Sequence, residues 1–392
     1  MAKAASFRAE GRPIVDLTDT NFHRQGIRYP DSRLRAYFSE YVDRRGYRSE
    51  SLGMRYTRDR LSEWYRSEGE LIDSERVILT ASTSESYSLV FQSLFSSGDR
   101  VLLPVPTYPL FDQLCDYARL EPVYYRLRPE NGFAPDFDDV VEGFEAGARA
   151  VVIISPNNPT GAVLSTSALA RFDRLAASYG ALVVSDEVFV GTERERCGIS
   201  AGGPPAAREA GRLRFGGVSK LFASPDVKLA WIVSSGIDNS RFDALELAAD
   251  TYLNASAPSQ YVTARMLEEG RDVVGEIREV LSHRAATVDA VLSRAAGPCA
   301  DGLQEHSVRN RPPLVWYRQA GGVHRVLQIP GADDEKLAID LLEREGVLVH
   351  PGYFYGFPDD GFFVISTVAR GEVLTEGLER IERFLLASGS VK

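Results

Sequence analysis

Three short runs of residues contain most of the side chains in this chain that could form a catalytic site. They are S-P-N-N-P-T-G at Ser155–Gly161, D-E-V-F at Asp186–Phe189, and the pair Ser219-Lys220. Each run directly follows an apolar stretch typical of a strand, namely V-V-I-I, A-L-V-V-S and R-L-R-F-G-G-V. Because open α/β sheets bind ligands at the carboxyl ends of their strands, we expect the three runs to meet at one site.

The groups in these runs are those needed to hold pyridoxal phosphate. The cofactor requires an amine for a Schiff base, a carboxylate beside its pyridine nitrogen, a donor to its phenolic oxygen and a phosphate cradle. These requirements are matched, in that order, by Lys220, Asp186, Asn158 and Ser219. A carboxylate beside the ring nitrogen favours the pyridinium form and makes the ring a better electron sink. The sequence therefore predicts a pyridoxal phosphate site.

The order of the runs resembles the fold type I aminotransferases of class I and II, and the resemblance extends over nearly the whole chain. It implies that Lys220 is the Schiff-base lysine, Asp186 the partner of the pyridine nitrogen and Asn158 the residue beside the phenolic oxygen. Tyr108, in P-T-Y-P-L-F, matches the aromatic residue that stacks on the cofactor ring. Tyr108 could instead be a packed aromatic at the start of a loop. By resemblance, the catalytic residues are Lys220, Asp186 and Tyr108.

A second set of residues matches the family's phosphate contacts. Ser82, Thr83 and Ser84, in L-T-A-S-T-S-E-S, fall where the first phosphate loop opens a helix. They could also be an N-cap with Glu85 in the first turn, and a helix N-terminus binds phosphate in either case.

Two further matches concern the phosphate and the assembly. Lys228 stands where the family usually has a phosphate-binding arginine, and Tyr47 has the spacing of a tyrosine that reaches a neighbouring subunit's phosphate. The resemblance thus implies a homodimer with shared active sites.

Two positions near the expected cofactor depart from the family pattern. Phe189 replaces a tyrosine that bonds the phenolic oxygen, which leaves Asn158 as the main partner there. Gly217 replaces a common phosphate-binding serine. With lysine in place of arginine at position 228, the phosphate cradle should depend more on point charge and backbone donors.

A third departure concerns the substrate. Many members bind the substrate α-carboxylate with an arginine in the last strand, where this chain has Val364-Ile365-Ser366. Arg24 and Arg28 lie in an N-terminal arm and could take over the carboxylate, or they could be solvated or bridge subunits. For Arg370, beside Gly371, the start of a helix is the favoured interpretation.

Composition limits the class of protein. The chain has 392 residues, 44% hydrophobic content and a net charge of −10, which suit a globular protein with a substantial core. Nucleic acid is an unexpected partner for so acidic a chain. The N-terminus lacks an apolar signal-like core, and no apolar run approaches membrane-spanning length.

Cysteine and histidine usage favours neither a disulfide framework nor a metal site. The cysteines form no metal spacing and no even set; they are Cys115, Cys197 and Cys299. The histidines show no pairing typical of ligands; they are His23, His283, His306, His324 and His350. We expect a cytoplasmic protein without a metal.

The arrangement of elements agrees with an α/β fold. Strand-like and helix-like stretches alternate from about residue 77 to 231, which predicts a mostly parallel sheet covered by helices. Helical patterns follow at Arg241–Tyr252 and Gln260–Arg294, and then a shorter α+β region. The resemblance implies a sheet of the seven-stranded type in a large cofactor-binding domain at 46–289. It implies a smaller α+β domain made of 1–45 and 290–392.

Three functions remain open at this point. The first is an aminotransferase that moves an amino group between an amino acid or related amine and a keto acid, with Lys220 as general base and acid. The second is a pyridoxal phosphate enzyme of specialised metabolism that uses the quinonoid carbanion for elimination, cyclisation, carbon-carbon bond formation or oxidation. The third is a cofactor-binding sensor without turnover. The missing arginine adds weight to the second, and the complete set of cofactor residues argues against the third.

Overall fold

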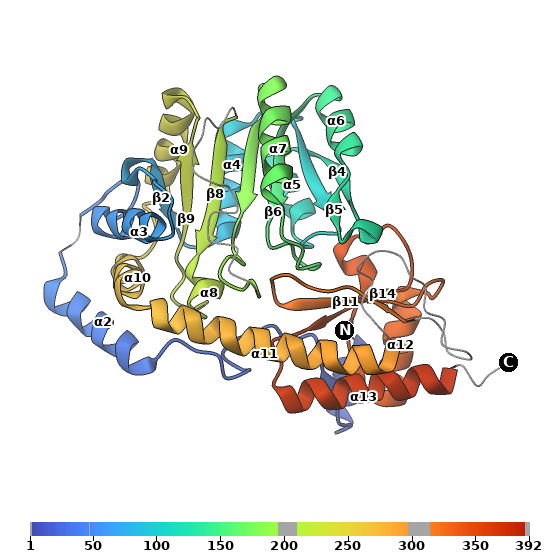
Figure 1. The fold of residues 1–392 in the computed structure, drawn as a ribbon. Coiled ribbons are helices and arrows are strands. Elements are labelled where there is room, and N and C mark those ends of the chain that lie inside the picture. Colours follow the sequence, from blue (N-terminus) through green and yellow to red (C-terminus); the bar gives the residue numbers. More distant parts are fainter. Residues whose placement is uncertain (1, 47, 195–209, 297–313, 389–392) are drawn as a thin grey trace.

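The computed structural model describes residues 2–46, 48–194, 210–296 and 314–388. A large sheet with its helices occupies one half of the molecule, and a smaller sheet lies beside it (Figure 1). The large sheet has the strand order β2-β9-β8-β7-β6-β3-β4-β5. Its strands are β2 (Val77–Thr80), β3 (Arg100–Val105), β4 (Glu121–Arg128), β5 (Ala134–Pro135), β6 (Ala148–Ile154), β7 (Leu182–Asp186), β8 (Arg212–Gly217) and β9 (Ala230–Ser235).

The pairing within this sheet confirms the predicted, mostly parallel arrangement. β4, β3, β6, β7 and β8 pair in parallel, while β9 runs antiparallel to both β8 and β2. The two-residue β5 adds an antiparallel eighth strand at one edge, beyond the seven long ones. In register, Ile154 lies beside Asp186, and Asp186 beside Phe215. The three sequence runs therefore begin at the carboxyl ends of neighbouring strands, on the same side of the sheet.

Helices cover both faces of the large sheet, as βα alternation requires (Figure 1). They are α3 (Arg55–Ser67), α4 (Thr83–Leu94), α5 (Phe111–Ala118), α6 (Phe137–Glu145), α7 (Thr166–Ser178) and α9 (Asn239–Thr251). The one-turn helix α8 (Val218–Leu221) lies at the carboxyl end of β8, and α10 (Ala257–Glu269) packs against α3. The outer helix α2 spans Asp31–Arg44, and the short 3₁₀ turns η1 and η2 span Ser74–Arg76 and Pro129–Asn131.

The single helix expected at Gln260–Arg294 is wrong, because the chain breaks at Gly270 into α10 and α11 (Arg271–Ala296). A Cβ atom at Gly270 would lie 2.5 Å from the carbonyl oxygen of Met266 and 2.9 Å from the ring of Phe222. The close packing of this corner therefore requires glycine. The helix expected at Arg241–Tyr252 is confirmed as α9 within one or two residues at each end.

The smaller sheet is antiparallel, with the order β10-β11-β14-β13. Its strands are β10 (Val315–Trp316), β11 (His324–Gln328), β13 (His350–Pro351) and β14 (Phe362–Ser366). Near it lie α1 (Ala2–Ala9), α12 (Asp334–Glu345), η3 (Gly352–Tyr355) and α13 (Gly371–Ser388). A separate parallel pair joins β1 (Val15–Asp16) to β12 (Val347–Leu348), so the N-terminal segment is tied to the C-terminal one. The predicted boundary at residue 289 falls inside the continuous helix α11, and the domain boundaries stay a prediction.

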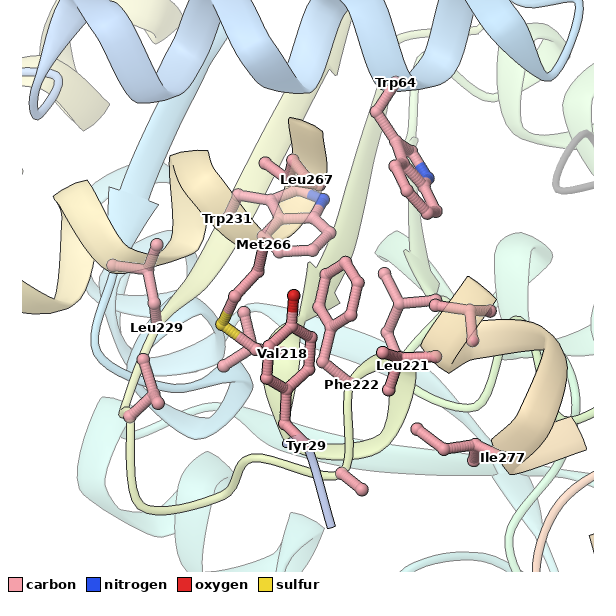
Figure 2. Packing of buried hydrophobic residues seen from close by; sticks show 14 of the residues in the cluster. Tyr29, Trp64, Val218, Leu221, Phe222, Leu229, Trp231, Met266, Leu267 and Ile277 are labelled. Carbon is pink, nitrogen blue, oxygen red and sulfur yellow. The ribbon is translucent and has the colours of Figure 1, made fainter. Parts of the chain in front are cut away.

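A buried apolar cluster lies directly behind the one-turn helix α8. Figure 2 shows Val218, Leu221 and Phe222 packed with Trp231 and Met266, among other buried side chains. Full burial of each such side chain stabilises the fold by about 1.5–3 kcal/mol. The cluster fixes the backbone on which Ser219 and Lys220 stand.

The turn S-P-N-N-P-T-G is hydrogen-bonded to the loop that precedes β11 of the smaller sheet. The carbonyl oxygen of Gly161 accepts from the N–H of Gly321 at 2.9 Å, and Gly322 N–H donates to Oγ1 of Thr192 at 2.8 Å. Gly161 has φ +67°, and a Cβ there would lie 2.4 Å from the carbonyl oxygen of Gly321. Only glycine permits this close approach, which joins the large sheet's turn to the smaller sheet.

Within residues 2–46, 48–194, 210–296 and 314–388, no helix is long and apolar enough to cross a membrane. The same ranges contain no group of three or more His, Cys, Asp or Glu side chains that could hold a metal ion.

Candidate active site

A cavity of about 420 Å³ lies at the carboxyl ends of the central strands. It brings together most of the residues that the sequence singles out: Ser82, Thr83, Ser84, Tyr108, Asn158, Asp186, Phe189, Ser219 and Lys220. The predicted convergence of the three runs is therefore found in the structure.

Lys220 reaches this cavity from α8. Val218 and Leu221 anchor the helix in the core, so the half-buried Lys220 faces the opposite way. Its Nζ lies 4.9 Å from the ring centre of Phe22 and 5.8 Å from that of Phe189. Burial lowers the pKa of Lys220, because the charged ammonium loses solvation there. A larger fraction of the amine is thus neutral and able to accept a proton.

Asp186 ends β7 and is buried. Its Oδ1 accepts from the N–H of Val188 at 2.9 Å, and its Oδ2 accepts from the hydroxyl of Tyr87 at 3.0 Å. Burial nevertheless raises the pKa of Asp186 to about 6. No Lys, Arg or His among the described residues forms an ion pair with this carboxylate. A cationic ligand group in the cavity would supply the missing counter-charge.

Asn158 offers a second unsatisfied group. Its Oδ1 is buried and has no hydrogen-bond partner among the described residues. The oxygen and nitrogen of an amide are assigned from their surroundings, so either can face a ligand. The neighbouring Asn157 instead holds the turn, because its Oδ1 accepts from the hydroxyl of Thr160 at 2.8 Å.

The polar run at the start of α4 forms the third side of the cavity. Ser82 is the N-cap, with Oγ accepting from the N–H of Glu85 at 3.1 Å, as the N-cap interpretation expects. The Glu85 carboxylate reaches back to the N–H of Ala81 at 2.5 Å. Thr83 and Ser84 occupy the first turn, where backbone N–H groups have no intrahelical acceptor. This end of α4 therefore suits an anion.

Tyr108 lies at the open side of the cavity and is 39% exposed. Burial raises the pKa of Tyr108, and the negative charge of Asp186 adds to the effect. The side chains of Tyr108 and Asp186 are therefore close enough for their charges to interact.

Other expected residues lie apart from this cavity. Lys228 is exposed, has φ +57° and does not line it. Arg24 lines an adjoining cavity of about 830 Å³ together with Lys220. Arg28 donates to the carbonyl oxygen of His23 at 3.3 and 3.4 Å. Tyr47 lies outside the described residues.

The last strand agrees with the interpretation that no arginine projects from it. Val364 and Ser366 are fully buried in β14, and Arg370 is exposed immediately before α13. The N–H of Arg370 donates to Oε1 of Gln25 at 3.2 Å, which ties the helix start to the N-terminal arm.

Sequence reasoning missed several residues that line the cavity: Thr20, Tyr87, His324, His350 and Tyr355. In the sequence, the two histidines are candidates only for metal ligands. Tyr87 follows Thr83 by four residues in α4, so helical periodicity could have placed it on the same face. No local signal marks the histidines, since they reach the cavity through sheet pairing.

The lining fits pyridoxal phosphate in charge and in hydrogen-bonding capacity. Asp186 lacks a cation, Asn158 has an unsatisfied polar atom, and α4 presents its N-terminus. Lys220 provides the amine. Each requirement of the cofactor is met by a different element, and these elements meet at one edge of the large sheet.

Comparison with known proteins gives a consistent picture. The family model for aminotransferase class I and II matches residues 50–381. The alanine aminotransferase of Mycobacterium tuberculosis is 26% identical over 98% of this chain and 88% of its own length. A glutamate-pyruvate aminotransferase of Escherichia coli is 24% identical over 98% and 93% of the two chains.

Solved structures share the fold. An alanine aminotransferase from Pyrococcus furiosus superposes with a TM-score of 0.87 at 23% identity, covering 98% of this chain and 95% of that one. A double mutant of Thermus thermophilus aspartate aminotransferase superposes with a TM-score of 0.84 at 25% identity and the same coverage. The predicted fold type is therefore confirmed.

Proposed function

The chain belongs to the class I and II aminotransferases, an enzyme family that depends on pyridoxal phosphate, and on this premise we propose how its own residues transfer an amino group. The reaction moves the group between an amino acid or related amine and a keto acid. The relatives do not favour the elimination, cyclisation, carbon-carbon bond formation or oxidation of the alternative.

Lys220 is the proposed attachment and proton-transfer residue. Bound pyridoxal phosphate supplies an electron sink for the electron pair left when a proton leaves the carbon beside the substrate amine. Lys220 would hold the cofactor aldehyde and, once released by the incoming amine, accept that proton at Nζ. The observation that carries this assignment is that the amine of Lys220 shares one cavity with Asp186 and Asn158. The lowered pKa of Lys220 suits a general base.

The remaining cofactor contacts are assigned from the same lining. Asp186 would pair with the pyridinium nitrogen, and Asn158 would bond the phenolic oxygen. Tyr108 would cover the ring, with Phe189 on the lining nearby. The phosphate would bind the start of α4 and the hydroxyl of the α8 serine; the proposed residues are Ser82, Thr83, Ser84 and Ser219. Lys228, which lies outside the cavity, is also proposed to bind the phosphate, and this role is supported by the family resemblance alone.

Covalent labelling tests the attachment site. Borohydride should fix the cofactor to the protein, and peptide mapping should find the label on Lys220. Lys220→Ala should fold, lose the label and lose turnover, whereas Lys228→Ala should keep the label. A label on Lys228 would contradict the assignment. Formation of pyridoxamine phosphate and a keto acid from an amine donor tests the reaction, with pyruvate the first acceptor because two relatives are named for it or for alanine.

We propose a homodimer with shared sites, in which Tyr47 reaches the partner's phosphate. Apolar residues exposed on α2 support an interface near that segment: Phe38 is 40% exposed and Val42 58%. Light scattering should give a dimer. A mixture of inactive Lys220→Ala and Tyr47→Phe protomers should regain some activity, and an active monomer would contradict the proposal. The expected cytoplasmic location likewise stays a proposal.

A further inference from the structure

The smaller sheet contributes a polar wall to the cavity that the proposed roles leave unused. His324 from β11, His350 from β13 and Tyr355 from η3 all line the cavity that contains Lys220. We call these three residues the small-domain wall. His324 and Tyr355 are buried, and His350 is half-buried.

Strand register explains why the two histidines act together. His324 lies opposite Ser366, and His350 lies opposite Val364, in antiparallel pairs with β14. Directly opposed residues share a face, and residues two apart on one strand share it too. Both imidazoles therefore project from the same face of the smaller sheet.

Hydrogen bonding and ring packing complete the wall. Nδ1 of His350 and the hydroxyl of Tyr355 share a hydrogen bond of 2.8 Å. The rings of His324 and Tyr355 pack edge to face with centres 6.0 Å apart. The wall is a packed unit that presents defined polar atoms to the cavity.

The wall is also fixed relative to the proposed cofactor contacts. The loop before β11 is bonded through Gly321 to Gly161, three residues beyond Asn158, and through Gly322 to Thr192. His324 follows this loop by two residues. These hydrogen bonds thus fix the position of the wall relative to the turn that carries Asn158.

The charges around the cavity decide what the wall can bind. Apart from histidine, the charged residues in its lining are Asp186 and Lys220, and both have proposed cofactor roles. Burial lowers the pKa of His324 to about 3, and His350 and Lys220 lower it further. Burial also lowers the pKa of His350, against a small opposing effect of Asp16. Both rings are neutral near pH 7, and burial raises the pKa of Tyr355.

A neutral wall should bind an uncharged polar group more favourably than a charged one. A carboxylate placed against it would lose water without gaining a cationic partner, which is unfavourable in a buried site. A hydroxyl or carboxamide can both donate to and accept from neutral imidazole and phenol groups. Arg24 does not alter this balance, because it lines the adjoining cavity and its side chain is 75% exposed.

Resting on the proposed aminotransferase function, we infer that the wall of His324, His350 and Tyr355 selects amino donors that present an uncharged hydroxyl or carboxamide group to it in preference to a carboxylate. The site thus distinguishes amino alcohols and amino-acid amides from the corresponding amino acids. The three wall residues determine specificity, and Lys220 performs the proton transfer.

Matched donors test this selectivity on the holoenzyme. One series is L-alanine, L-alaninamide and (S)-2-aminopropan-1-ol, and the second is the corresponding set built on L-phenylalanine. Conversion of the cofactor is followed by absorbance in single turnovers, with rates corrected for the fraction of free amine. We expect kcat/KM at least tenfold higher for the amide and the alcohol than for the carboxylate.

Variants of the wall separate its electrostatics from its packing. His324→Lys should shift the carboxylate-to-amide ratio of kcat/KM at least tenfold toward the carboxylate. His324→Gln, which stays uncharged and polar, should keep the wild-type order. If His324→Lys fails to bind the cofactor, His350→Lys takes its place, with His350→Gln as control. Comparing ratios between variants cancels differences in amine ionisation among the donors.

The outcomes distinguish this inference from the proposed function. A wild-type enzyme that prefers the carboxylates, with no shift of the ratio in the lysine variant, overturns the inference and leaves aminotransfer intact. Failure of all six donors and of a wider amine panel to convert Lys220-bound cofactor overturns the proposed function and the inference with it. A wild-type preference for uncharged donors that is weakened by His324→Lys supports both.

Discussion

Two adjacent carboxylates at the end of β7, Asp186 and Glu187, point to opposite sides of the chain and have different partners. Asp186 faces the cavity, accepts bonds from Tyr87 and Val188, and has no cation among its described partners. Glu187 faces the core, where both its oxygens accept from Arg214 at 2.8 Å. Arg214 also pairs with Glu70.

The difference separates charge that supports folding from charge reserved for a ligand. The core face satisfies its carboxylate with a bidentate guanidinium, as a buried charge normally requires. The cavity face leaves a carboxylate with a raised pKa, which costs stability until a cationic group binds. Such uncompensated groups are expected at functional sites.

The largest expected effect comes from neutralising the cavity-facing carboxylate. Asp186→Asn should lower the transamination rate by about a thousandfold, or about 4 kcal/mol, because an amide cannot hold the pyridine nitrogen protonated. Single-turnover absorbance measures this rate. Cofactor binding should survive, and near-normal turnover would contradict the proposed role.

The same change should stabilise the cofactor-free protein. The folded pKa of Asp186, about 6, lies above the ordinary 3.8, so its contribution to stability is present below pH 4 and lost as the pH rises through 6. That shift corresponds to roughly 3 kcal/mol at pH 8. Thermal unfolding of the apo-protein should show Asp186→Asn gaining more over wild type at pH 8 than at pH 5. An equal Tm difference at both values would show that the carboxylate is not destabilised by burial.

The core face should give the opposite result. Arg214→Met removes the guanidinium that pairs with the buried carboxylates of Glu187 and Glu70, at a cost of about 3–5 kcal/mol in the free energy of unfolding. Denaturant titration measures this loss. Restoring neutrality in the double variant Arg214→Met/Glu187→Gln should recover part of it.

A matched surface pair is the control for this prediction. Arg126 also bonds a carboxylate through two nitrogens, to Asp139, but its side chain is 46% exposed. Arg126→Met should therefore cost about 1 kcal/mol or less. Similar losses for Arg126→Met and Arg214→Met would remove the distinction between the buried network and an ordinary ion pair.

Local sequence patterns were sufficient to predict that the residues of the three runs meet in one cavity. Asp186 ends β7, and Asn158 and Lys220 come shortly after the ends of β6 and β8, so parallel pairing of these strands brings all three to the same carboxyl ends. The Ser82 cap was likewise visible as a serine before a helical pattern. These predictions needed only the order of elements along the chain.

The substrate side could not be predicted in this way. His324 and His350 meet because β11 and β13 both pair with β14 in one particular register, and a shift of one residue would turn each side chain to the other face. The break at Gly270 depends on contacts with Phe222, which is far away in the sequence. Both features follow from tertiary packing.

The smallest expected effect concerns the N-terminal arm that carries Arg24 and Arg28, which we call the rim of the site. The two arginines share this arm but have different surroundings. Arg24 lines the cavity that adjoins Lys220 and lies 3.9 Å from Asp19, while Arg28 bonds the carbonyl oxygen of His23. Because an exposed ion pair contributes about 0.2–1 kcal/mol, Arg24→Ala should raise KM about fivefold at most for donors with a carboxylate remote from the amine, such as L-glutamate. Steady-state kinetics should show no such change with L-alaninamide, or in Arg28→Ala with either donor. A larger rise in Arg28→Ala, or in Arg370→Ala, would place the carboxylate contact elsewhere on the N-terminal arm or at the start of α13. It would also show that the rim, like the core face of β7, supplies a specific counter-charge.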